Sequence, residues 1–264
     1  MAVYLAGERL YGDNLSPEEI ERWFEDEREG YADLGAKDSK SYHYPYHALD
    51  RQHLFRHLPD GDYPSVLSIG GAYGHELRPL LGRIKHAVIV EPSEAFQGSK
   101  LGDLSLNYVK PQASGVLPFS DNSFDLACAL SVLHHIPNVS FVLQEMYRTV
   151  KPGGYALLRE PTTSMGDWRR PRRGLTPRER GLPLPWFRDA LQRNGFEIVR
   201  ETRCLNAITP RLGRWLKHGA YNSEAMVRFD SLLTLALSWN QRYHAESLFH
   251  RLRPWAVAYV LRKP

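Results

Sequence analysis

Residues 65–76 read Ser-Val-Leu-Ser-Ile-Gly-Gly-Ala-Tyr-Gly-His-Glu, and this stretch decides the fold. A short apolar run ends in closely spaced glycines and then enters a helical pattern, which is typical of a strand, a tight turn and a helix N-terminus. Glycines at such a turn let a nucleotide-like ligand approach the bare backbone. A second apolar run, residues 86–90, ends in Glu91, a carboxylate able to accept hydrogen bonds from both hydroxyls of a ribose. Together these features predict a site for an adenosine-type cofactor.

Short strands and helices alternate from residue 63 to residue 161. The pattern predicts strands at 65–69, 86–90, 106–109, 124–130 and 155–159, and helices at 74–81, from Ser93 onward and at 139–150. Such alternation is typical of a mostly parallel sheet with helices on both faces. Ligands in these sheets bind beyond the carboxyl ends of the strands, so the residues that follow each strand are the candidate site residues.

The segment before this core is polar, aromatic and helical in pattern. Ser16-Pro-Glu-Glu19 predicts a helix that starts at Pro17 and stops at Gly30, because it combines a capping residue, a first-turn proline and first-turn acids. Residues 42–47 hold three tyrosines, Tyr42, Tyr44 and Tyr46, together with two histidines. Two interpretations of that string stay open: a lid that stacks on an acceptor, or packing of the N-terminal segment onto the sheet.

After residue 161 the chain is less regular. We expect a helix at 186–194, a strand at 196–203, helices within 210–252 and a final strand at 255–261. Met226, Phe229, Leu233, Ala236 and Leu237 share one face at helical spacing. That stripe favours a core or dimer helix, and it also allows a lipid-linked acceptor.

Composition sets limits on the cell compartment and the partners. The chain has 264 residues and a formal net charge of +4. Its N-terminus is a poor signal peptide, and the longest apolar stretch, residues 231–239, is too short to span a bilayer. We expect the two cysteines, Cys128 and Cys204, to be reduced, and we expect a cytoplasmic protein with no metal site. We expect a monomer or homodimer, and no nucleic-acid-binding module is evident.

Basic charge is concentrated in one loop. It contains Arg169, Arg170, Arg172, Arg173, Arg178 and Arg180. Because arginine forks match phosphate and carboxylate groups, the loop is a candidate site for an anionic acceptor. The alternative is an ordinary solvated loop.

Four segments together resemble the class I S-adenosylmethionine-dependent methyltransferases that act on small molecules. They are Val66-Leu-Ser-Ile-Gly-Gly-Ala-Tyr-Gly74, Gly115-Val-Leu-Pro-Phe-Ser-Asp-Asn-Ser-Phe-Asp-Leu126, Ser131-Val-Leu-His-His-Ile136 and Leu143-Gln-Glu-Met-Tyr-Arg-Thr-Val-Lys-Pro-Gly-Gly154. The order and spacing of the four carry the resemblance, which covers residues 63–161. The last segment, a helix with an arginine followed by a Lys-Pro-Gly-Gly turn, is the most specific.

The resemblance implies a Rossmann-like α/β fold. Its sheet would have seven mostly parallel strands, the last one antiparallel, with helices on both faces. Residues 1–60 would form an N-terminal helical cap or lid, and residues 61–264 the methyltransferase domain. Within that domain, 61–161 would bind the cofactor, 162–182 would be the arginine-rich loop, and 210–252 would be a helical insertion before the last strand.

The resemblance also implies the cofactor S-adenosylmethionine, its product S-adenosylhomocysteine and a set of binding residues. That set is Gly70, Gly71, Ala72, Gly74, Glu91, Pro92, Ala113, Ser114, Gly115, Leu130 and Ser131. Two positions depart from the family. Ser68 stands where an acidic residue usually helps to hold the cofactor's ammonium group. Ala72 stands where the middle glycine is usual, and its methyl group can be accommodated, with binding retained, if φ is negative at that residue.

Methyl transfer from a sulfonium depends mainly on alignment of the acceptor, and a hydroxyl acceptor also benefits from a general base. His134, His135 and Glu160 follow strands and are the candidate bases. Each also has a structural interpretation: the histidines as pocket lining, and Glu160 as an ion-pair partner of Arg159 or a loop arginine. We expect oxygen as the acceptor atom, on an anionic sugar, a glycan or a carboxylic metabolite.

Two other functions stay open. Ser68 and Ala72 allow a non-catalytic binding or scaffold protein on the same fold. The glycine turn alone also permits a nicotinamide-dependent oxidoreductase, although no Tyr-x-x-x-Lys pair stands at a suitable place.

Overall fold

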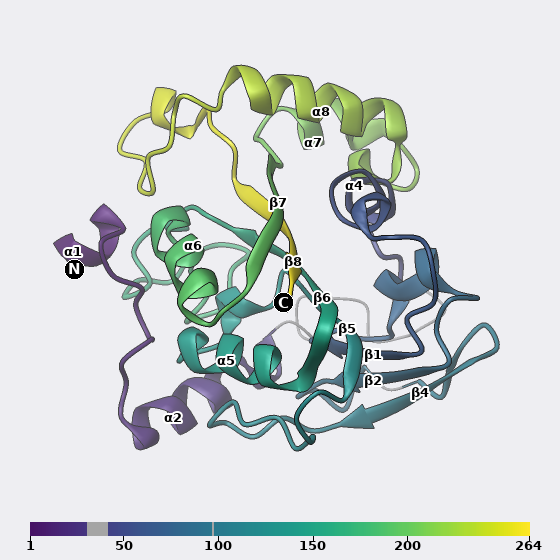
Figure 1. Ribbon diagram of the computed structural model, residues 1–264. Coiled ribbons are helices and arrows are strands. Elements are labelled where there is room, and N and C mark those ends of the chain that lie inside the picture. Colours follow the sequence, from purple (N-terminus) through teal and green to yellow (C-terminus); the bar gives the residue numbers. More distant parts are fainter. Residues whose placement is uncertain (31–41, 97) are drawn as a thin grey trace.

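A single mixed sheet forms the centre of the molecule in the computed structural model, which describes residues 1–30, 42–96 and 98–264 (Figure 1). In spatial order its strands are β3 (Lys100–Leu101), β4 (Leu104–Val109), β2 (His86–Val90), β1 (Ser65–Ile69), β5 (Phe124–Leu130), β6 (Val150–Pro161), β8 (Ala256–Arg262) and β7 (Glu197–Cys204). Strands β4, β2, β1, β5 and β6 run parallel, and β8 is antiparallel to both β6 and β7. The Rossmann-like prediction is confirmed, including the antiparallel last strand. The sheet has eight strands rather than seven, because the two-residue β3 pairs with β4 at the edge.

Helices cover both faces of the sheet, as predicted. On one face, α5 (Val139–Thr149) and α6 (Leu184–Arg193) bury apolar side chains such as Leu143, Met146 and Phe187. On the other face pack α4 (His47–His53), η1 (Phe55–His57), η2 (His75–Leu80) and part of α8 (Glu224–Ala236). The central strands β1 and β5 are buried nearly throughout, which explains why they read as short continuous apolar runs.

The N-terminal helix is the one that the sequence predicts. Helix α2 (Pro17–Arg28) follows the short α1 (Ala2–Ala6). The Ser16 hydroxyl accepts a hydrogen bond from the Glu19 backbone N–H, and the Glu19 carboxylate accepts one from the Ser16 N–H. This reciprocal capping fixes where α2 begins. Residues 31–41 of the predicted cap lie outside the described residues.

Two predictions in the first half of the domain need correction. The helix expected at 74–81 is the six-residue 3₁₀-helix η2, with Pro79 inside it. The helix expected from Ser93 is wrong, because residues 93–96 form a turn. The Ser93 N–H donates to the Glu91 carboxylate, and the Ser93 hydroxyl accepts from the Ala95 N–H. These local bonds satisfy groups that a helix would otherwise use.

The insertion before β8 is helical, as predicted, but its long helix is rotated relative to the predicted stripe: Met226, Leu233 and Leu237 are half-buried, and Ala236 is exposed. It contains α7 (Thr209–Leu212), η4 (Gly213–Trp215), η5 (Ala220–Asn222), α8 and η6 (Phe249–Arg251). Residues Val227, Asp230 and Thr234 of α8 face the protein, whereas Phe229, predicted on the core side, is exposed. The Asp230 carboxylate accepts bonds from the Leu205 N–H and the Asn206 amide, so polar contacts orient this helix. No helix in the described parts of the chain has the length and apolar content needed to cross a membrane.

Candidate active site

A cavity of about 740 Å³ lies where the parallel strands end. Its wall includes Gly70 and Gly71 after β1, Glu91 after β2, Ser131 after β5 and Pro161 at the end of β6. Residues from four strand ends therefore surround one space, as the strand-end rule predicts.

The glycine turn brings bare backbone to this cavity. A Cβ atom on Gly70 would lie 2.5 Å from Val132, and one on Gly71 would collide with the Ser68 hydroxyl and the Glu76 carboxylate, so neither position has room for a side chain. Ala72 has a φ of 45°, in the left-handed region, so the condition of a negative φ at this residue is not met. The Tyr108 hydroxyl donates to the Ala72 carbonyl at 2.8 Å and helps to hold this backbone.

Glu91 anchors the next part of the wall. Its carboxylate accepts hydrogen bonds from the backbone N–H groups of Ala72 and Ser93, each at 3.1 Å. The side chain is mostly buried, and burial raises the pKa of Glu91 to about 7 despite these bonds. Near neutral pH it is thus ready to ionise as soon as a donor from a ligand reaches it.

A second carboxylate, Glu76, stands against the glycine turn. It comes from η2, lines the cavity and lies 2.5 Å from the Ser68 hydroxyl, which donates to it. Burial raises the pKa of Glu76 to about 7. The acid missing at position 68 is therefore present in space, supplied by the following helical turn. Sequence reasoning missed Glu76, although an acid two residues after Gly74 was a usable signal.

The predicted cofactor residues fall into two groups. On the cavity wall are Gly70, Gly71, Glu91, Pro92, Ala113, Gly115, Leu130 and Ser131. Ala72, Gly74 and Ser114 are not among the lining residues that the structure describes. Ala72 and Gly74 act on the turn itself: Ala72 donates to Glu91, and Gly74, at φ 72°, precedes η2.

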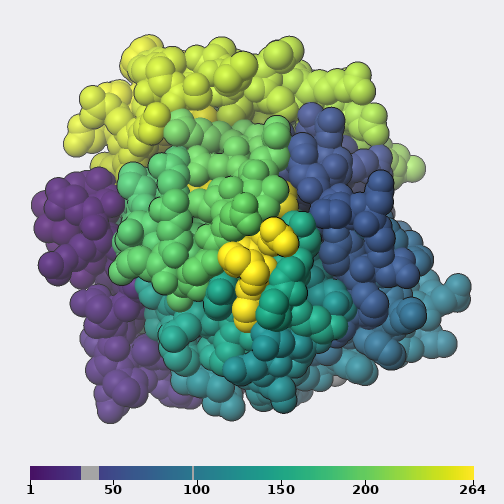
Figure 2. Space-filling model, in the orientation of Figure 1, coloured from purple at the N-terminus to yellow at the C-terminus, as the bar shows by residue number. Residues whose placement is uncertain are grey.

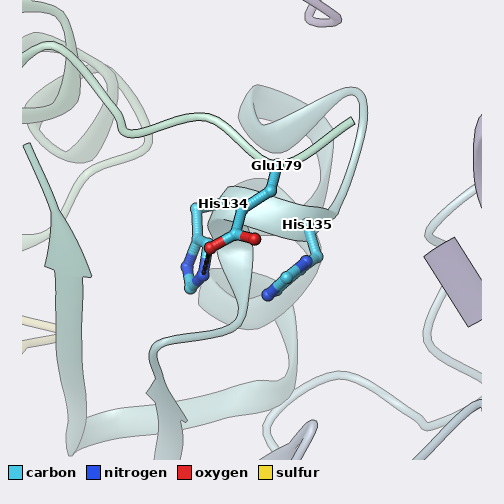
Figure 3. A group of neighbouring side chains, drawn as sticks. All are labelled: His134, His135 and Glu179. Atoms are coloured by element: carbon cyan, nitrogen blue, oxygen red, sulfur yellow. Dashed lines mark ion pairs between the residues drawn. The ribbon is translucent and has the colours of Figure 1, made fainter. Parts of the chain in front are cut away.

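Two adjacent histidines and a glutamate, all of which line the cavity, lie close together (Figure 3). His134 and His135 belong to η3 (Leu133–His135), and Glu179 comes from the arginine-rich loop. The His134 Nε2 lies 3.5 Å from a Glu179 oxygen, and its Nδ1 lies 2.8 Å from Glu160. Burial opposes a charge on His134, but these two carboxylates outweigh it and raise its pKa to about 9; the same pairing lowers the pKa of Glu179 to about 2, also against the effect of burial. His134 is accordingly an imidazolium near neutral pH.

His135 has the opposite electrostatics. Burial lowers the pKa of His135, and the neighbouring His134 charge lowers it further. Its Nδ1 lies 2.8 Å from Glu27 of α2, and the Glu27 carboxylate also accepts from the Thr176 hydroxyl at 2.5 Å. His135 is therefore a neutral imidazole whose ring is oriented through Nδ1 by a carboxylate.

The same three residues also have the spacing of a metal site. Possible ligand atoms of His134, His135 and Glu179 all lie within 4.8 Å of one another. The sequence showed no ligand cluster because Glu179 lies far from the histidine pair in the chain.

Comparisons with known proteins agree with this geometry. A family model described as "Methyltransferase domain" matches residues 34–201, which is more than half of the chain. The chain belongs to the class I S-adenosylmethionine-dependent methyltransferases.

Individual relatives match shorter parts. A ubiquinone/menaquinone biosynthesis C-methyltransferase of Stenotrophomonas maltophilia is 41% identical over 68 residues, 26% of this chain and 26% of that protein. A 24-methylenesterol C-methyltransferase of Oryza sativa is 32% identical over 134 residues, 46% of this chain and 36% of that protein. The matches thus span about a third or less of these relatives. A solved N-methyltransferase of Haemonchus contortus, in complex with S-adenosylhomocysteine, has a TM-score of 0.54 at 17% identity, covering 82% of this chain and 52% of that one, and it supports the fold alone.

In this methyltransferase, Glu160 lies inside the protein rather than on the cavity wall. Its carboxylate is fully buried and accepts from the backbone N–H groups of Val132, Leu133 and His134, in addition to its contact with the His134 ring. Glu160 therefore fixes the start of η3 and the orientation of His134. The ion pair with Arg159 or a loop arginine, considered from the sequence, is not formed.

Arg159 has a buried partner of its own. Its Nε lies 2.7 Å from Asp50 of α4, one of its terminal nitrogens donates to the Ser131 hydroxyl, and the guanidinium stacks 4.2 Å above the Tyr46 ring. Asp50 also accepts from the Tyr44 hydroxyl at 2.5 Å. Packing of the tyrosine string onto the sheet is confirmed for Tyr44, whose hydroxyl accepts a hydrogen bond from the Arg159 guanidinium of β6 at 3.0 Å. Tyr42, Tyr44 and Tyr46 also line the cavity, and a lid that stacks on an acceptor stays a prediction.

The arginines of the loop have mainly structural partners. Arg180 donates to the carbonyl groups of His134 and Ile136, Arg172 donates to that of Glu179, and Arg178 pairs with Asp26. Among the described lining residues, the loop contributes Thr163, Met165, Gly174, Leu175 and Glu179, and none of its arginines. The loop closes the cavity through its backbone and apolar side chains.

Proposed function

We propose that this protein transfers the methyl group of S-adenosylmethionine to a small-molecule acceptor. One observation carries the proposal: a single cavity joins the glycine turn and Glu91 to a neutral histidine, His135, held by Glu27. The first part suits the cofactor, and the second suits removal of a proton from the acceptor. The protein's main contribution to rate is to align the attacking atom with the sulfur–methyl bond.

The cofactor would use the residues already identified at the strand ends. Glu91 accepts from the ribose hydroxyls, and Glu76 faces the ammonium group in place of the usual acid at position 68. The full set proposed around the cofactor is Gly70, Gly71, Ala72, Gly74, Glu76, Glu91, Pro92, Ala113, Ser114, Gly115, Leu130 and Ser131. The turn residues Ala72 and Gly74 act there by holding the loop.

His135 is the proposed general base. As the acceptor's lone pair forms a bond to the methyl carbon, the carbon–sulfur bond breaks and the sulfonium becomes a neutral thioether. His135 takes the proton that the acceptor atom loses. Glu27 is a positioning residue that stabilises the resulting imidazolium, and Glu160 and Glu179 hold His134 as a cation that keeps His135 neutral beforehand. No step requires a metal, so the proposal keeps the metal-free chemistry expected from the sequence.

The wall of the cavity supports an uncharged acceptor. It is mainly apolar and aromatic, and its charged side chains include four glutamates. Its cationic side chains already have acidic partners: Arg159 pairs with Asp50, His134 with Glu160 and Glu179, and Arg28 with Glu25 and Glu29. We therefore favour a hydroxyl oxygen on an aromatic or unsaturated acceptor over the anionic sugar, glycan or carboxylic metabolite suggested by the arginine loop. Both relatives described above are C-methyltransferases, so an acidic carbon is the second candidate, and the same base would serve it.

The proposed compartment is the cytoplasm. Cys128 on β5 and Cys204 at the end of β7 are buried free thiols, in keeping with a reducing environment. We propose a monomer or homodimer, without nucleic acid as a partner.

Two measurements test the proposal. Calorimetry with S-adenosylhomocysteine should show binding, weakened by Glu91→Ala without loss of the fold; no binding at millimolar ligand refutes the enzyme. Formation of S-adenosylhomocysteine from the methyl donor, screened against phenols and enols, should then fall about 10²–10⁴-fold in His135→Asn with cofactor affinity retained. Binding without turnover on any acceptor would favour the scaffold alternative.

A further inference from the structure

Helix α8 exposes an apolar side to solvent, whereas an ordinary surface helix buries its apolar side against the protein. Phe229, Leu232, Leu235 and Trp239 follow one another at helical spacing along and just beyond it, with exposed fractions of 40%, 70%, 71% and 61%. The opposite side, which packs on the protein, is anchored by the hydrogen bonds of the buried Asp230. Exposure of an apolar stripe to water is unfavourable for a monomer, so its outward orientation indicates a binding partner that covers it.

A second exposed segment extends the stripe. The Trp239 ring lies 5.7 Å from the Phe249 ring of η6, and the neighbouring Leu248 is 79% exposed. We call Phe229, Leu232, Leu235, Trp239, Leu248 and Phe249 the apolar face. Figure 2 shows α8 and the segment after it as one continuous band along an edge of the molecule.

The charge around the apolar face is mainly positive. Arg228, Arg242 and Arg251 are exposed beside it. Two acids are exposed there as well: Glu246, which precedes Leu248 by two residues, and Glu224 at the start of α8, which is already paired with Arg51. Residues 205–223, which include α7 beside α8, contain Arg211, Arg214 and Lys217 but no acidic residue. Trp215, the last residue of η4 in that segment, is 83% exposed.

We propose that the apolar face docks on the surface of an anionic lipid bilayer. Tryptophan, phenylalanine and leucine side chains set among arginines are suited to the boundary between acyl chains and headgroups, and each nearby basic residue adds attraction to acidic lipids. A second copy of this chain fits less well, because a two-fold contact would bring the same basic residues against one another.

The position of a second cavity agrees with this orientation. A space of about 310 Å³ is lined by Gly213, Arg214 and Ala220 from the segment beside α8. It shares Pro45, Tyr46, Leu205 and Trp255 with the wall of the main cavity. Docking would therefore place one end of the cavity system near the lipid; this point rests on the proposed methyl transfer, whereas docking itself does not.

Sedimentation of the full chain with vesicles tests the proposal. Phosphatidylcholine vesicles that contain phosphatidylglycerol should bind the protein more tightly than phosphatidylcholine alone, and raising salt from 0.1 to 1 M should weaken binding as the Debye length falls from about 10 to about 3 Å. Leu232→Gln/Leu235→Gln should reduce vesicle affinity at least about tenfold, because both side chains lose apolar contact with lipid. Leu81→Gln, at an exposed leucine outside the apolar face, is the matched control and should bind as the original chain does.

A second readout locates the contact. Brominated lipids should quench tryptophan fluorescence on binding, and Trp239→Phe should lose part of that quenching. Calorimetry with S-adenosylhomocysteine on every variant separates the docking proposal from the proposed methyl transfer. Retained cofactor binding without vesicle binding overturns docking alone. Vesicle binding without cofactor binding overturns the methyltransferase function alone. Vesicle binding unaffected by Leu232→Gln/Leu235→Gln, or a concentration-dependent dimer that this variant abolishes, also overturns docking.

Discussion

Cofactor binding should release protons, because Glu76 and Glu91 are both only partly ionised in the free protein. Burial raises the pKa of each to about 7. A ribose donating two hydroxyls to Glu91 and an ammonium facing Glu76 both favour the charged carboxylate. Binding therefore lowers both pKa values, and affinity rises with pH through this range.

The size of the effect follows from linkage. At pH 7 each carboxylate is about half protonated, so each gives up about half a proton and the complex releases about one in total. Between pH 6 and 7 the ionised fraction rises about fivefold for each group, so the dissociation constant should fall about thirtyfold when both contribute. His134 and His135 add little, since the pKa of one is raised to about 9 and that of the other is lowered.

Calorimetry of S-adenosylhomocysteine in buffers with different ionisation enthalpies counts these protons directly. Glu76→Gln should release about half a proton and retain about a fivefold pH dependence from Glu91. Glu94→Gln, at an exposed carboxylate outside the described cavity wall, is the control and should release as many protons as the original chain. Release near zero, with affinity constant from pH 6 to 7, would refute the reasoning for both residues, and full release in Glu76→Gln would refute it for Glu76.

Three further substitutions test the surrounding structure. Ala72→Gly relieves a left-handed backbone conformation that costs alanine about 1–2 kcal/mol, but glycine also stabilises the unfolded chain by about 0.5–1 kcal/mol of conformational entropy. The midpoint of thermal unfolding should therefore rise by about 2 °C, and a fall would show that the backbone at Ala72 is not strained. Asp50→Ala leaves Arg159 buried without its carboxylate and should lower the free energy of unfolding in urea by about 3–5 kcal/mol. Arg170→Glu/Arg173→Glu changes exposed side chains away from the cavity wall, so stability should change by less than about 0.5 kcal/mol and turnover should not change; selective loss of acceptor use would restore the anionic acceptor.

The core of the fold is predictable because its signals are local. The runs at 65–69 and 86–90 are largely buried, so they stay mainly apolar. Lys151-Pro-Gly-Gly154 follows α5 and lies inside β6, where the pairing with β5 shifts register before the apolar part of the strand, so the turn expected at these residues is wrong. The orientation of α8 was not predictable in this way. Its apolar spacing predicts a buried stripe, and the partners of Asp230, which include Leu205, Asn206 and Tyr221, turn a neighbouring side of the helix inward.

The same distinction applies to the site. Gly70, Gly71, Glu91 and Ser131 follow strands, and the topology of a parallel sheet is enough to bring them together. Glu27 and Glu179 come from a helix and a loop outside that topology, and each meets a histidine through tertiary packing alone. A sequence identifies both as acids but has no periodicity that places them at η3. The different roles of His134 and His135 were not predictable from the sequence either. Their pKa values differ because the two rings contact different carboxylates, and tertiary packing alone sets those contacts.

In the sequence, Ser68 and Ala72 allow a non-catalytic protein. The structure makes both residues weaker evidence for that alternative. Glu76 can present its carboxylate where an acid at the end of β1 would present one, because the turn brings η2 back over the end of that strand. Ser68, at that strand end, donates a hydrogen bond to the Glu76 carboxylate. Ala72 adopts the left-handed backbone usual for glycine, held by Tyr108 at its carbonyl and by Glu91 at its N–H. A protein that had lost the need for the cofactor would have no reason to keep a strained alanine and two buried, partly protonated carboxylates around an open cavity. Both departures are therefore better understood as substitutions within a working cofactor site than as traces of its loss.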